Sequence, residues 1–545
     1  MSSRKNPCRR VIRSGRHRTP FSPLTWPGIS SAGAKRSSSN LSSNSIVGIG
    51  ENRCTTWSTR GTTRFPQPKS KTMSPITAEI ACLTAVEMLE HFECGELSPV
   101  EVTEAALEQI ELHNKTVNAY CFLDEQTTRV EARRAQERRR RKGALGLLDG
   151  VPVAIKDVFM FRGWPTRKGS KLIDESPAPV DSPAVASLRR HGFIPLGKTT
   201  TPEFGWKGVT DSPLCGVTRN PWDPAKGAGG SSGGSAAAVP LGMGALALGT
   251  DAGGSIRIPA SFCGAVGFKP TQGRVPFWPT SPFGQLAHPG PIAWSVQDAA
   301  HLMNVICEPD ARDTTLPPPE VDFVAALADG IKGWQVAFSP ALGYVDVDQE
   351  VAEVVAAAVK RFEDLGAHIE EIDPGFPNPR EAFDRLFYSG AANALRTISA
   401  EQRRAMDPAL IRVAEWAEQL SMLDYLAALN ERAALIERMN RFHDRYALLL
   451  TPTLPIAAFE AGLEVPPDWQ DERWPSWTPF TYPFNMTGQP AISVPCGFTR
   501  AGLPVGLQII GPRHRDEWVL QAAHAYQGIE PFTQRRPALF GQPRD

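Results

Sequence analysis

Short apolar runs alternate with helical patterns along much of this chain. Val151 to Lys156 follows a turn signal at Asp149-Gly150 and is typical of a buried strand. A helical pattern over 183–190 ends at Gly192, and Phe193 to Leu196 predicts the next strand. Because a strand, a helix and a strand in this order favour parallel pairing with the helix packed on the sheet, we expect an α/β fold.

The same alternation recurs in the second half of the chain. A strand pattern at 334–338, a helical pattern at 349–365 and a strand pattern at 368–372 repeat the unit, whereas 380–445 is almost purely helical. Further strand patterns lie at 447–450, 491–494 and 506–510. We therefore predict a large, mixed, mostly parallel twisted sheet with helices on both faces and a helical insertion at about 380–445.

The zero net charge conceals an uneven distribution of charge. Residues 1–72 hold fourteen of the 58 Lys and Arg but only one of the 58 acidic residues, Glu51, which leaves residues 73–545 at a net charge of −13. The first segment is rich in Ser and Arg and lacks hydrophobic periodicity, so we expect it to be disordered. We interpret it first as an over-extended start before Met73, second as a transit peptide and last as a nucleic-acid-binding tail. The remainder, 73–545, is expected to form one large domain.

The cysteines and the apolar segments bear on compartment. The chain contains no CxxC pair and no secretory apolar region at either candidate start, so we expect a reduced, cytoplasmic protein without a metal or cofactor. The apolar run Ala236 to Leu248 is too short to span a bilayer, and we expect a buried core helix there. The nine cysteines are Cys8, Cys54, Cys82, Cys94, Cys121, Cys215, Cys263, Cys307 and Cys496.

Two glycine-serine turns, Gly229 to Ser235 and Asp251 to Arg257, carry the strongest signal for chemistry. Glycines without Cβ let several backbone N–H groups converge on one point, as binding of a developing oxyanion requires. A serine beside them is a candidate nucleophile. Serine is weak until a base removes its proton, so the sequence must supply a base elsewhere.

Two familiar motifs match literally but in the wrong context. Gly192 to Thr199 satisfies the P-loop pattern, yet a helix pattern precedes it and its interior is an apolar strand, so nucleotide binding is not expected. Gly229 to Gly233 satisfies the nucleophile-elbow pattern G-x-S-x-G, but 222–227 before it is not a strand, and no histidine downstream has a telling context.

Lys156 is the candidate base. Its position at the end of an apolar strand would lower its pKa, since burial disfavours the charged amine. Taken alone, Lys156 is better explained as a lysine that extends to solvent and pairs with Asp157. Taken with the two serine turns, it becomes the base that they lack.

These three segments and their order resemble the amidase signature family. The resemblance covers roughly 98–527, and its serine-glycine core is highly specific. The core segments are Gly150–Asp157, Gly229–Ser235 and Gly249–Ala260. Flanking matches are Gly197–Thr199, Glu203-Phe204, Asn220–Asp223, Gly267–Thr271, Leu450–Pro455 and Phe484–Ala491.

The resemblance implies that 73–545 is an amidase domain, an amidohydrolase that cuts linear amide C–N bonds through an acyl-enzyme. It implies that Lys156 is the base, that Ser231 is the bridging serine after a cis peptide bond, and that Ser255 is the nucleophile. Ser231 and Ser255 are 24 positions apart, as the family pattern requires, which selects Ser231 over Ser232. The backbone N–H groups expected to form the oxyanion hole belong to Ala252, Gly253, Gly254 and Ser255. The residues expected to support the site are Ser232, Asp251 and Arg257.

Two features distinguish this chain within the resemblance. It has Gly227-Ala228 before the first turn, and it has Ala252 where glycine is frequent in the family. Because alanine has a Cβ, the N–H of residue 252 can point at the oxyanion only if φ there is negative. The A subunit of a tRNA-dependent amidotransferase is the alternative, but its Ser-Ser-Leu-Asp-Gln segment is replaced here by Pro282 to Pro291. We therefore expect a stand-alone amidase acting on a small-molecule amide, without nucleic acid or membrane, and forming a homodimer.

Aromatic residues are the candidate walls of the acyl pocket, although for each of them plain core packing is the simpler explanation. They are Trp278, Phe283, Trp469, Trp474, Trp477, Phe480, Tyr482 and Phe484.

Overall fold

A computed structural model describes residues 75–315, 320–530 and 532–540 of the chain. The basic extension at 1–72 lies outside these residues. Within them, eleven strands form one mixed sheet and two more form a separate hairpin. The strands of the sheet, in chain order, are β1 (Tyr120–Leu123), β2 (Pro152–Lys156), β3 (Ile194–Thr199), β6 (Leu246–Asp251), β7 (Val266–Lys269), β8 (His288–Ala293), β9 (Gln335–Phe338), β10 (His368–Glu371), β11 (Leu448–Pro452), β12 (Ala491–Phe498) and β13 (Pro504–Ile510). The hairpin consists of β4 (Asp211–Ser212) and β5 (Gly216–Val217).

The sheet has the order β1-β3-β2-β6-β8-β7-β12-β13-β11-β9-β10. Parallel pairs form two blocks, β3-β2-β6 and β11-β9-β10, which contain the two strand-helix-strand units expected from the sequence. Strands between the blocks pair antiparallel, as does β1 at one edge. The expected mixed α/β fold is confirmed, and its parallel order lies in these two blocks.

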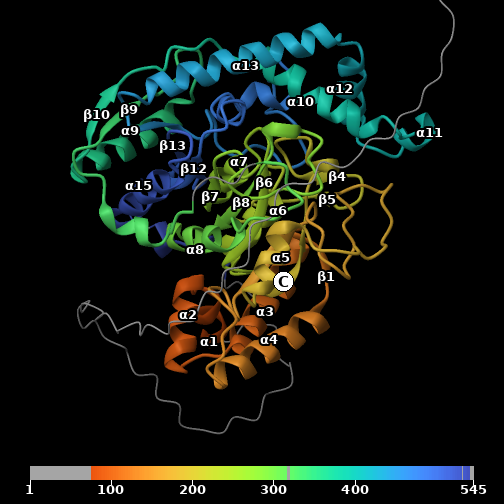
Figure 1. Ribbon diagram of the computed structural model, residues 1–545, viewed down its shortest axis with the longest axis vertical. Coiled ribbons are helices and arrows are strands. Elements are labelled where there is room, and N and C mark those ends of the chain that lie inside the picture. The colour runs from red at the N-terminus through yellow and green to blue at the C-terminus, as the bar shows by residue number, and fades with distance from the viewer. Residues whose placement is uncertain (1–74, 316–319, 531, 541–545) are drawn as a thin grey trace, which may run out of the picture. The chain divides into compact units, whose positions relative to one another are not determined.

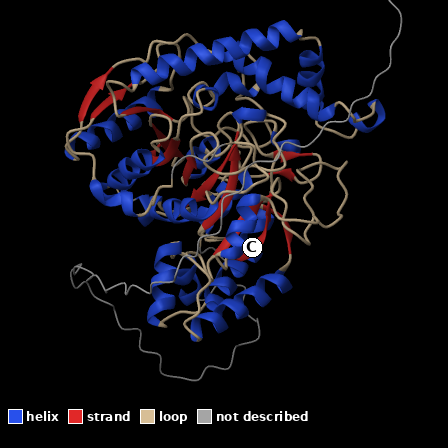
Figure 2. Ribbon diagram, in the orientation of Figure 1, coloured by secondary structure: helices blue, strands red, loops and turns tan. Residues whose placement is uncertain are grey.

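Helices cover both faces of the sheet (Figures 1 and 2). Alternate residues of β2 show the division, because Val153 and Ile155 enter one apolar cluster and Ala154 another. The first cluster includes α5 (Pro183–Arg190), α8 (Val296–Ile306), α9 (Gln349–Asp364) and α15 (Asp516–Ile529). The second includes the short helices α6 (Gly233–Ala238) and α7 (Arg257–Cys263). Lys156 shares its face with Ala154, so the strand directs it towards α6.

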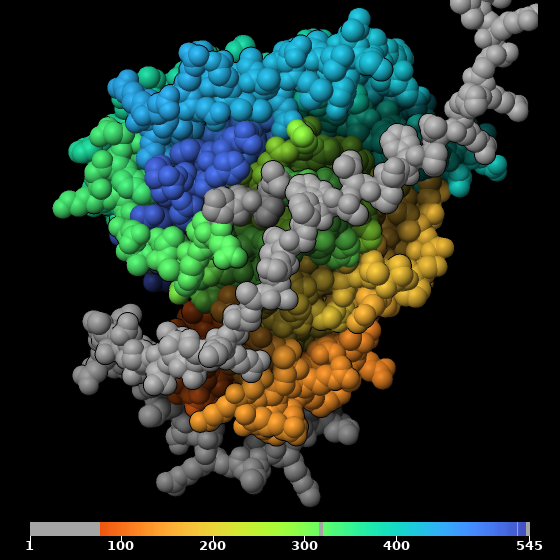
Figure 3. All heavy atoms as spheres, viewed as in Figure 1, coloured from red at the N-terminus to blue at the C-terminus, as the bar shows by residue number. Residues whose placement is uncertain are grey.

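Helical segments flank the sheet at both ends of the view in Figure 1. At the bottom lie α1 (Pro75–Ala81), α2 (Ala85–Cys94), α3 (Pro99–Val117) and α4 (Glu125–Arg140). The stretch 380–445, between β10 and β11, holds α10 (Arg380–Leu395), α11 (Ala400–Arg403), α12 (Pro408–Glu418) and α13 (Met422–Phe442). Figure 3 shows α13 along the upper surface. Its first two residues, Met422 and Leu423, are exposed.

The prediction of one core helix over 236–248 is wrong in its second half. After α6 the chain makes a 3-10 turn at Val239–Leu241 and then enters β6. Pro240 and the positive φ angles of Gly242 and Gly244 end the helical conformation. Because every residue of the run is buried, its apolar pattern contained no period to separate helix from strand.

None of the described helices is both long enough and apolar enough for a bilayer span.

Candidate active site

The predicted lysine and the second serine turn lie at the carboxyl ends of two neighbouring parallel strands. β2 and β6 are parallel neighbours with Ile155 opposite Leu248, so Lys156 at the end of β2 lies beside the last residues of β6. The turn 252–255 then connects β6 to α7, while Ser231 and Ser232 immediately precede α6. Parallel pairing therefore brings Lys156 beside a turn that lies about 100 positions later in the sequence.

Lys156 is buried and surrounded by hydroxyl groups. Its Nζ lies 2.7 Å from Ser231 Oγ, 2.9 Å from Ser232 Oγ and 2.9 Å from Thr250 Oγ1. Burial lowers the pKa of Lys156 well below its ordinary value, and the Asp251 carboxylate opposes this only in part. Burial therefore shifts the equilibrium of Lys156 towards the neutral amine.

The alternative pairing of Lys156 with Asp157 is not seen. Asp157 lies instead beside Lys198, at 3.7 Å, and no ion pair among the described residues involves Lys156. Adjacent strand residues point to opposite faces, which separates the Asp157 carboxylate from the Lys156 amine.

Ser231 and Ser232 occupy different positions around Lys156. The Gly230–Ser231 peptide bond is cis, as the family resemblance implied. Ser232 Oγ donates to the carbonyl oxygen of Thr250 at 3.1 Å and accepts from the N–H of Thr250 at 3.3 Å. Gly230 lets the chain before Ser231 pack closely on Val209, because a Cβ at 230 would lie 2.4 Å from the main chain of Val209.

Ser255 faces the same small cavity as Ser231. The cavity has a volume of about 80 Å³, and its wall also includes Thr250 and Ala252. The two serine turns are joined directly, since the N–H of Ser232 donates to the carbonyl oxygen of Ser255 at 3.1 Å. Lysine, bridging serine and candidate nucleophile are thus placed around one cavity.

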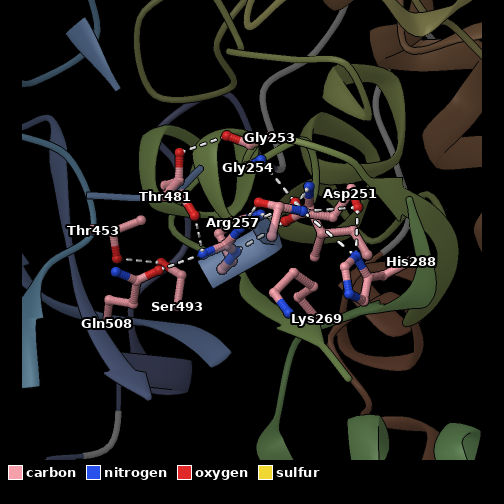
Figure 4. A network of polar contacts seen from close by, with 12 residues as sticks. Asp251, Gly253, Gly254, Arg257, Lys269, His288, Thr453, Thr481, Ser493 and Gln508 are labelled. Carbon is pink, nitrogen blue, oxygen red and sulfur yellow. Dashed lines mark hydrogen bonds and ion pairs between the residues drawn. The ribbon is translucent and has the colours of Figure 1, made fainter. Parts of the chain in front are cut away.

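A buried ion pair holds the second turn in shape (Figure 4). Arg257 donates from Nε and Nη2 to the two carboxylate oxygens of Asp251, each at 3.0 Å. The same carboxylate accepts from the N–H groups of Gly254 at 2.7 Å and Ile256 at 3.2 Å. Burial alone would raise the pKa of Asp251, but the Arg257 guanidinium outweighs burial and lowers it. Asp251 and Arg257 thus link β6, the turn 252–255 and the start of α7 through one buried ion pair.

Residues far along the chain complete this network. Arg257 Nη1 donates to the carbonyl oxygen of Thr481 at 3.0 Å and to Gln508 Oε1 at 2.7 Å, and Nη2 donates to Asn485 Oδ1 at 2.6 Å. Asn485, in α14 (Pro483–Met486), donates back to Asp251 Oδ1 at 2.8 Å. No pattern in the sequence singles out Thr481 or Gln508. Asn485 belongs to the flanking match Phe484–Ala491, but the sequence assigned it no role.

Four backbone amides were predicted to face the oxyanion, and they are not equivalent. The N–H of Gly254 is occupied by Asp251, whereas those of Ala252, Gly253 and Ser255 have no hydrogen-bond partner among the described residues. The φ angle of Ala252 is not positive. The condition under which an alanine at this position can present its N–H is therefore met. Three donors therefore remain available at the turn.

Phenylalanines form much of the cavity wall. Phe204, Phe277 and Phe283 line it, and Phe283 stacks on Phe387 with ring centroids 4.1 Å apart. Of the aromatic residues singled out from the sequence, only Phe283 reaches the cavity; Trp278, Trp469, Trp474, Trp477, Phe480, Tyr482 and Phe484 do not line it. Trp474 lies behind the turn, where it packs edge-on against Phe383.

The literal P-loop match is part of the sheet. Its Gly197, Lys198 and Thr199 belong to the buried strand β3, and Lys198 Nζ donates to the carbonyl oxygen of Phe159 at 2.5 Å. The described residues also contain no cluster of three or more His, Cys, Asp or Glu side chains placed to hold a metal ion.

Comparison with known proteins identifies the family of this chain. The Amidase family profile matches residues 101–520. The chain belongs to the amidase signature family. Like the family, this amidase is an amidohydrolase that acts on C–N amide bonds.

Relatives of this amidase include both enzyme types considered from the sequence. It is 39% identical to an acylamidase of Rhodococcus erythropolis, over 84% of this chain and 97% of that protein. It is 36% identical to the A subunit of the glutamyl-tRNA(Gln) amidotransferase of a Synechococcus strain, over 82% of this chain and 96% of that protein. A solved bacterial aryl acylamidase superposes with a TM-score of 0.80 at 32% identity, covering 85% of this chain and all of that one.

Proposed function

We propose that this amidase forms an acyl-enzyme on Ser255, with Lys156 as the base and Ser231 as the proton relay between them. The observation that carries the proposal is the 2.7 Å contact between the buried Lys156 amine and Ser231 Oγ, in the absence of any carboxylate partner for Lys156 among the described residues. An uncharged amine in contact with a hydroxyl supplies the base that a serine nucleophile requires.

The hydrogen bonds around Lys156 favour Ser231 over Ser232 as the proton donor. A neutral amine has two N–H groups and one lone pair. Ser232 gives its only hydroxyl proton to Thr250, so towards Lys156 it acts as an acceptor. If Thr250 Oγ1 accepts the second N–H, the lone pair is directed at Ser231, whose proton it draws.

The proposed reaction follows from this direction of proton transfer. Lys156 takes the proton of Ser231, Ser231 takes that of Ser255, and Ser255 Oγ attacks the amide carbonyl. The free N–H groups of Ala252, Gly253 and Ser255 stabilise the oxyanion, and Ser231 returns a proton to the leaving amine. Water then cleaves the acyl-enzyme through the same relay. Gly254 has a different role in this scheme, because its N–H holds the Asp251 carboxylate.

We propose acyl amides with a compact apolar or aromatic part as the substrates. The three phenylalanines of the wall support this class, since apolar side chains in a pocket favour apolar groups, while Lys168, Thr280 and Ser281 add polar groups to the same wall. Similarity to the acylamidase and to the aryl acylamidase structure supports it further. The cleavage products would be the acid and the amine.

Action as part of an amidotransferase complex is the second candidate, because several relatives carry that name. The segment Pro282 to Pro291 argues against it. Pro282, Phe283 and Ala287 of this segment line the cavity, so the region that departs from those relatives is the region that shapes the site. A purified single chain that hydrolyses simple amides would support the stand-alone amidase.

The deciding experiment is labelling with a fluorophosphonate followed by peptide mapping. We expect one adduct, on Ser255, with none in Ser255→Ala and slow labelling in Lys156→Ala. A screen of aliphatic and aryl amides with the same preparations then defines the substrate. An adduct on Ser231 or Ser232 in the wild-type protein would overturn the assignment.

Two expectations from the sequence stay predictions. The described cysteines form no disulfide bond, which supports a reducing compartment such as the cytoplasm. The homodimer is testable by light scattering of the purified chain.

A further inference from the structure

Two cysteines from distant parts of the chain meet outside the active site. Cys121 lies on the edge strand β1, and Cys215 lies in the turn of the β4-β5 hairpin. Their side chains are in hydrogen-bond contact, and Cys121 Sγ lies 3.4 Å from the carbonyl oxygen of Lys198. Neither thiol takes part in the amidase chemistry proposed above.

Both thiols line an open cavity of about 440 Å³, distinct from the one that holds Ser255. Its wall also includes Asp157 and Arg167, and the cavity is open to solvent. A small reagent in solvent therefore reaches the pair without unfolding of the surrounding structure.

Hydrogen bonds hold the two cysteines in position. The side-chain amide of Asn118 donates to the carbonyl oxygen of Cys215 at 2.7 Å and to that of Val217 at 3.2 Å. The N–H of Cys215 donates to Ser212 Oγ at 3.0 Å. Since Asn118 is only three residues before Cys121, it fixes the hairpin against the strand that carries the partner thiol.

We propose that Cys121 and Cys215 form an oxidation site at which a peroxide converts the two thiols into a reversible disulfide bond. The bond would join β1 to the β4-β5 hairpin, which in the reduced protein accepts hydrogen bonds from Asn118 at this point.

The reaction balances with peroxide as the oxidant. The Cys215 thiolate attacks one peroxide oxygen, the O–O bond breaks, and hydroxide leaves with a sulfenic acid on Cys215. The Cys121 thiol then attacks that sulfur and water leaves, so two electrons pass from the two thiols to the peroxide. A dithiol such as dithiothreitol reverses the step.

The surroundings assign the first step to Cys215. The hydrogen bond from Cys121 lowers the pKa of the Cys215 thiol despite burial, with help from Ser212 and Arg167 and against Asp157. Cys121 has the opposite setting, because its hydrogen bond to Cys215 and burial raise its pKa, opposed by Lys198. Cys215 is thus the attacking thiol and Cys121 the resolving one.

The hairpin connects this pair to the serine turns. Val209 packs against Gly230, and Thr210 Oγ1 accepts from the N–H of Gly233 at 3.1 Å, just before the hairpin begins. Because the two thiols interact with each other in one cavity wall, we expect the bond to form without displacing these contacts. We therefore expect oxidation to stabilise the fold and to leave amidase activity intact.

The test is titration of the reduced enzyme with hydrogen peroxide, followed by alkylation and non-reducing peptide mapping. We expect one peptide pair linked through Cys121 and Cys215, a mass loss of about 2 Da relative to the two thiols, and release by dithiothreitol. The thermal midpoint should rise on oxidation and fall back on reduction.

Serine variants supply the controls. Cys215→Ser and Cys121→Ser should each remove the linked peptides and the reversible rise in the thermal midpoint, whereas Cys94→Ser should retain both. In Cys121→Ser the sulfenic acid on Cys215 should persist and react with dimedone. Overoxidation of both thiols without a link, or a link that survives in Cys215→Ser, would overturn the proposal.

Discussion

Ser232 Oγ gives its proton to the carbonyl oxygen of Thr250, 3.1 Å away, and accepts from the N–H of the same residue. This pairing separates two adjacent serines that both contact Lys156. Ser232 has no proton left for the amine, whereas the Ser231 hydroxyl donates to no other acceptor among the described residues. The two serines should therefore differ sharply when each is removed.

We predict that Ser231→Ala lowers kcat by about 10³-fold or more, while Ser232→Ala lowers it by only about tenfold. The first change removes the relay, and the second removes one acceptor of a Lys156 N–H, a contact of about 1 kcal/mol. Steady-state kinetics on one anilide substrate measures both, with circular dichroism as the control for folding. Equal losses in the two variants would contradict the relay.

We predict that kcat/KM rises with pH through an apparent pKa well below the ordinary lysine value of 10.5. Burial lowers the pKa of Lys156, and only the neutral amine accepts the proton of Ser231. The pH profile of kcat/KM measures this ionisation in the free enzyme. A profile that rises only near 10.5 would show that Lys156 is not the base.

We predict that Lys156→Met is more stable than the wild type at neutral pH. Between the lowered pKa of folded Lys156 and about 10.5, the unfolded chain binds a proton that the folded chain does not, so wild-type stability increases with pH across that window. The slope is about 1.4 kcal/mol per pH unit for one proton. Thermal midpoints over a pH series should show a shallower rise in the variant.

We predict that Asp251→Asn destabilises the protein by about 3 to 5 kcal/mol, because it leaves Arg257 as a buried charge without its partner. Asp174→Asn is the matched control, since Asp174 is exposed. Denaturant unfolding measures the difference. A wild-type midpoint for Asp251→Asn would show that this ion pair does not hold the turn.

We predict that Thr250→Val lowers kcat by about tenfold and that Thr250→Ser keeps most of it. Valine removes the oxygen that lies 2.9 Å from Lys156 Nζ, and serine restores it. The pH profile distinguishes this role from simple packing, because loss of one acceptor alters the apparent pKa of Lys156. An unchanged profile in Thr250→Val would assign Thr250 a packing role only.

The elements with strong periodicity were predictable. The helical pattern over 183–190 corresponds to α5, and the strand-helix-strand unit at 334–372 corresponds to β9, α9 and β10 within a residue or two. Each of these helices has one apolar and one polar face, so its period survives in the sequence. Residues buried on every side, such as Leu246 in β6, show no such period.

β8 was missed for a different reason. Its sequence, His288 to Ala293, contains two prolines, which argue against a central strand because proline donates no ladder hydrogen bond. In the structure both prolines pair with β6, whereas β7 pairs only with Ile292 and Ala293. At the two prolines, β8 therefore has no partner strand on its β7 side and needs no N–H donor there. Only the register of the strands shows this.

The site was predictable in its local parts and not in its long-range ones. Lys156, Ser231 and Ser255 lie in short segments whose pattern is specific. Thr250 contacts Lys156 only because β2 and β6 are neighbours, and Gln508 reaches Arg257 from β13. Partners of this kind depend on strand order, which no single segment encodes.

The hydrogen bonds of Arg257 to Thr481, Asn485 and Gln508 impose an order on biosynthesis. A ribosome that has released only the first 470 residues has already delivered every serine and lysine of the relay, but none of these three partners. The nascent enzyme should therefore remain inert until its last strands emerge. Two separately expressed fragments, divided between β11 and α14, should regain activity only when they are mixed.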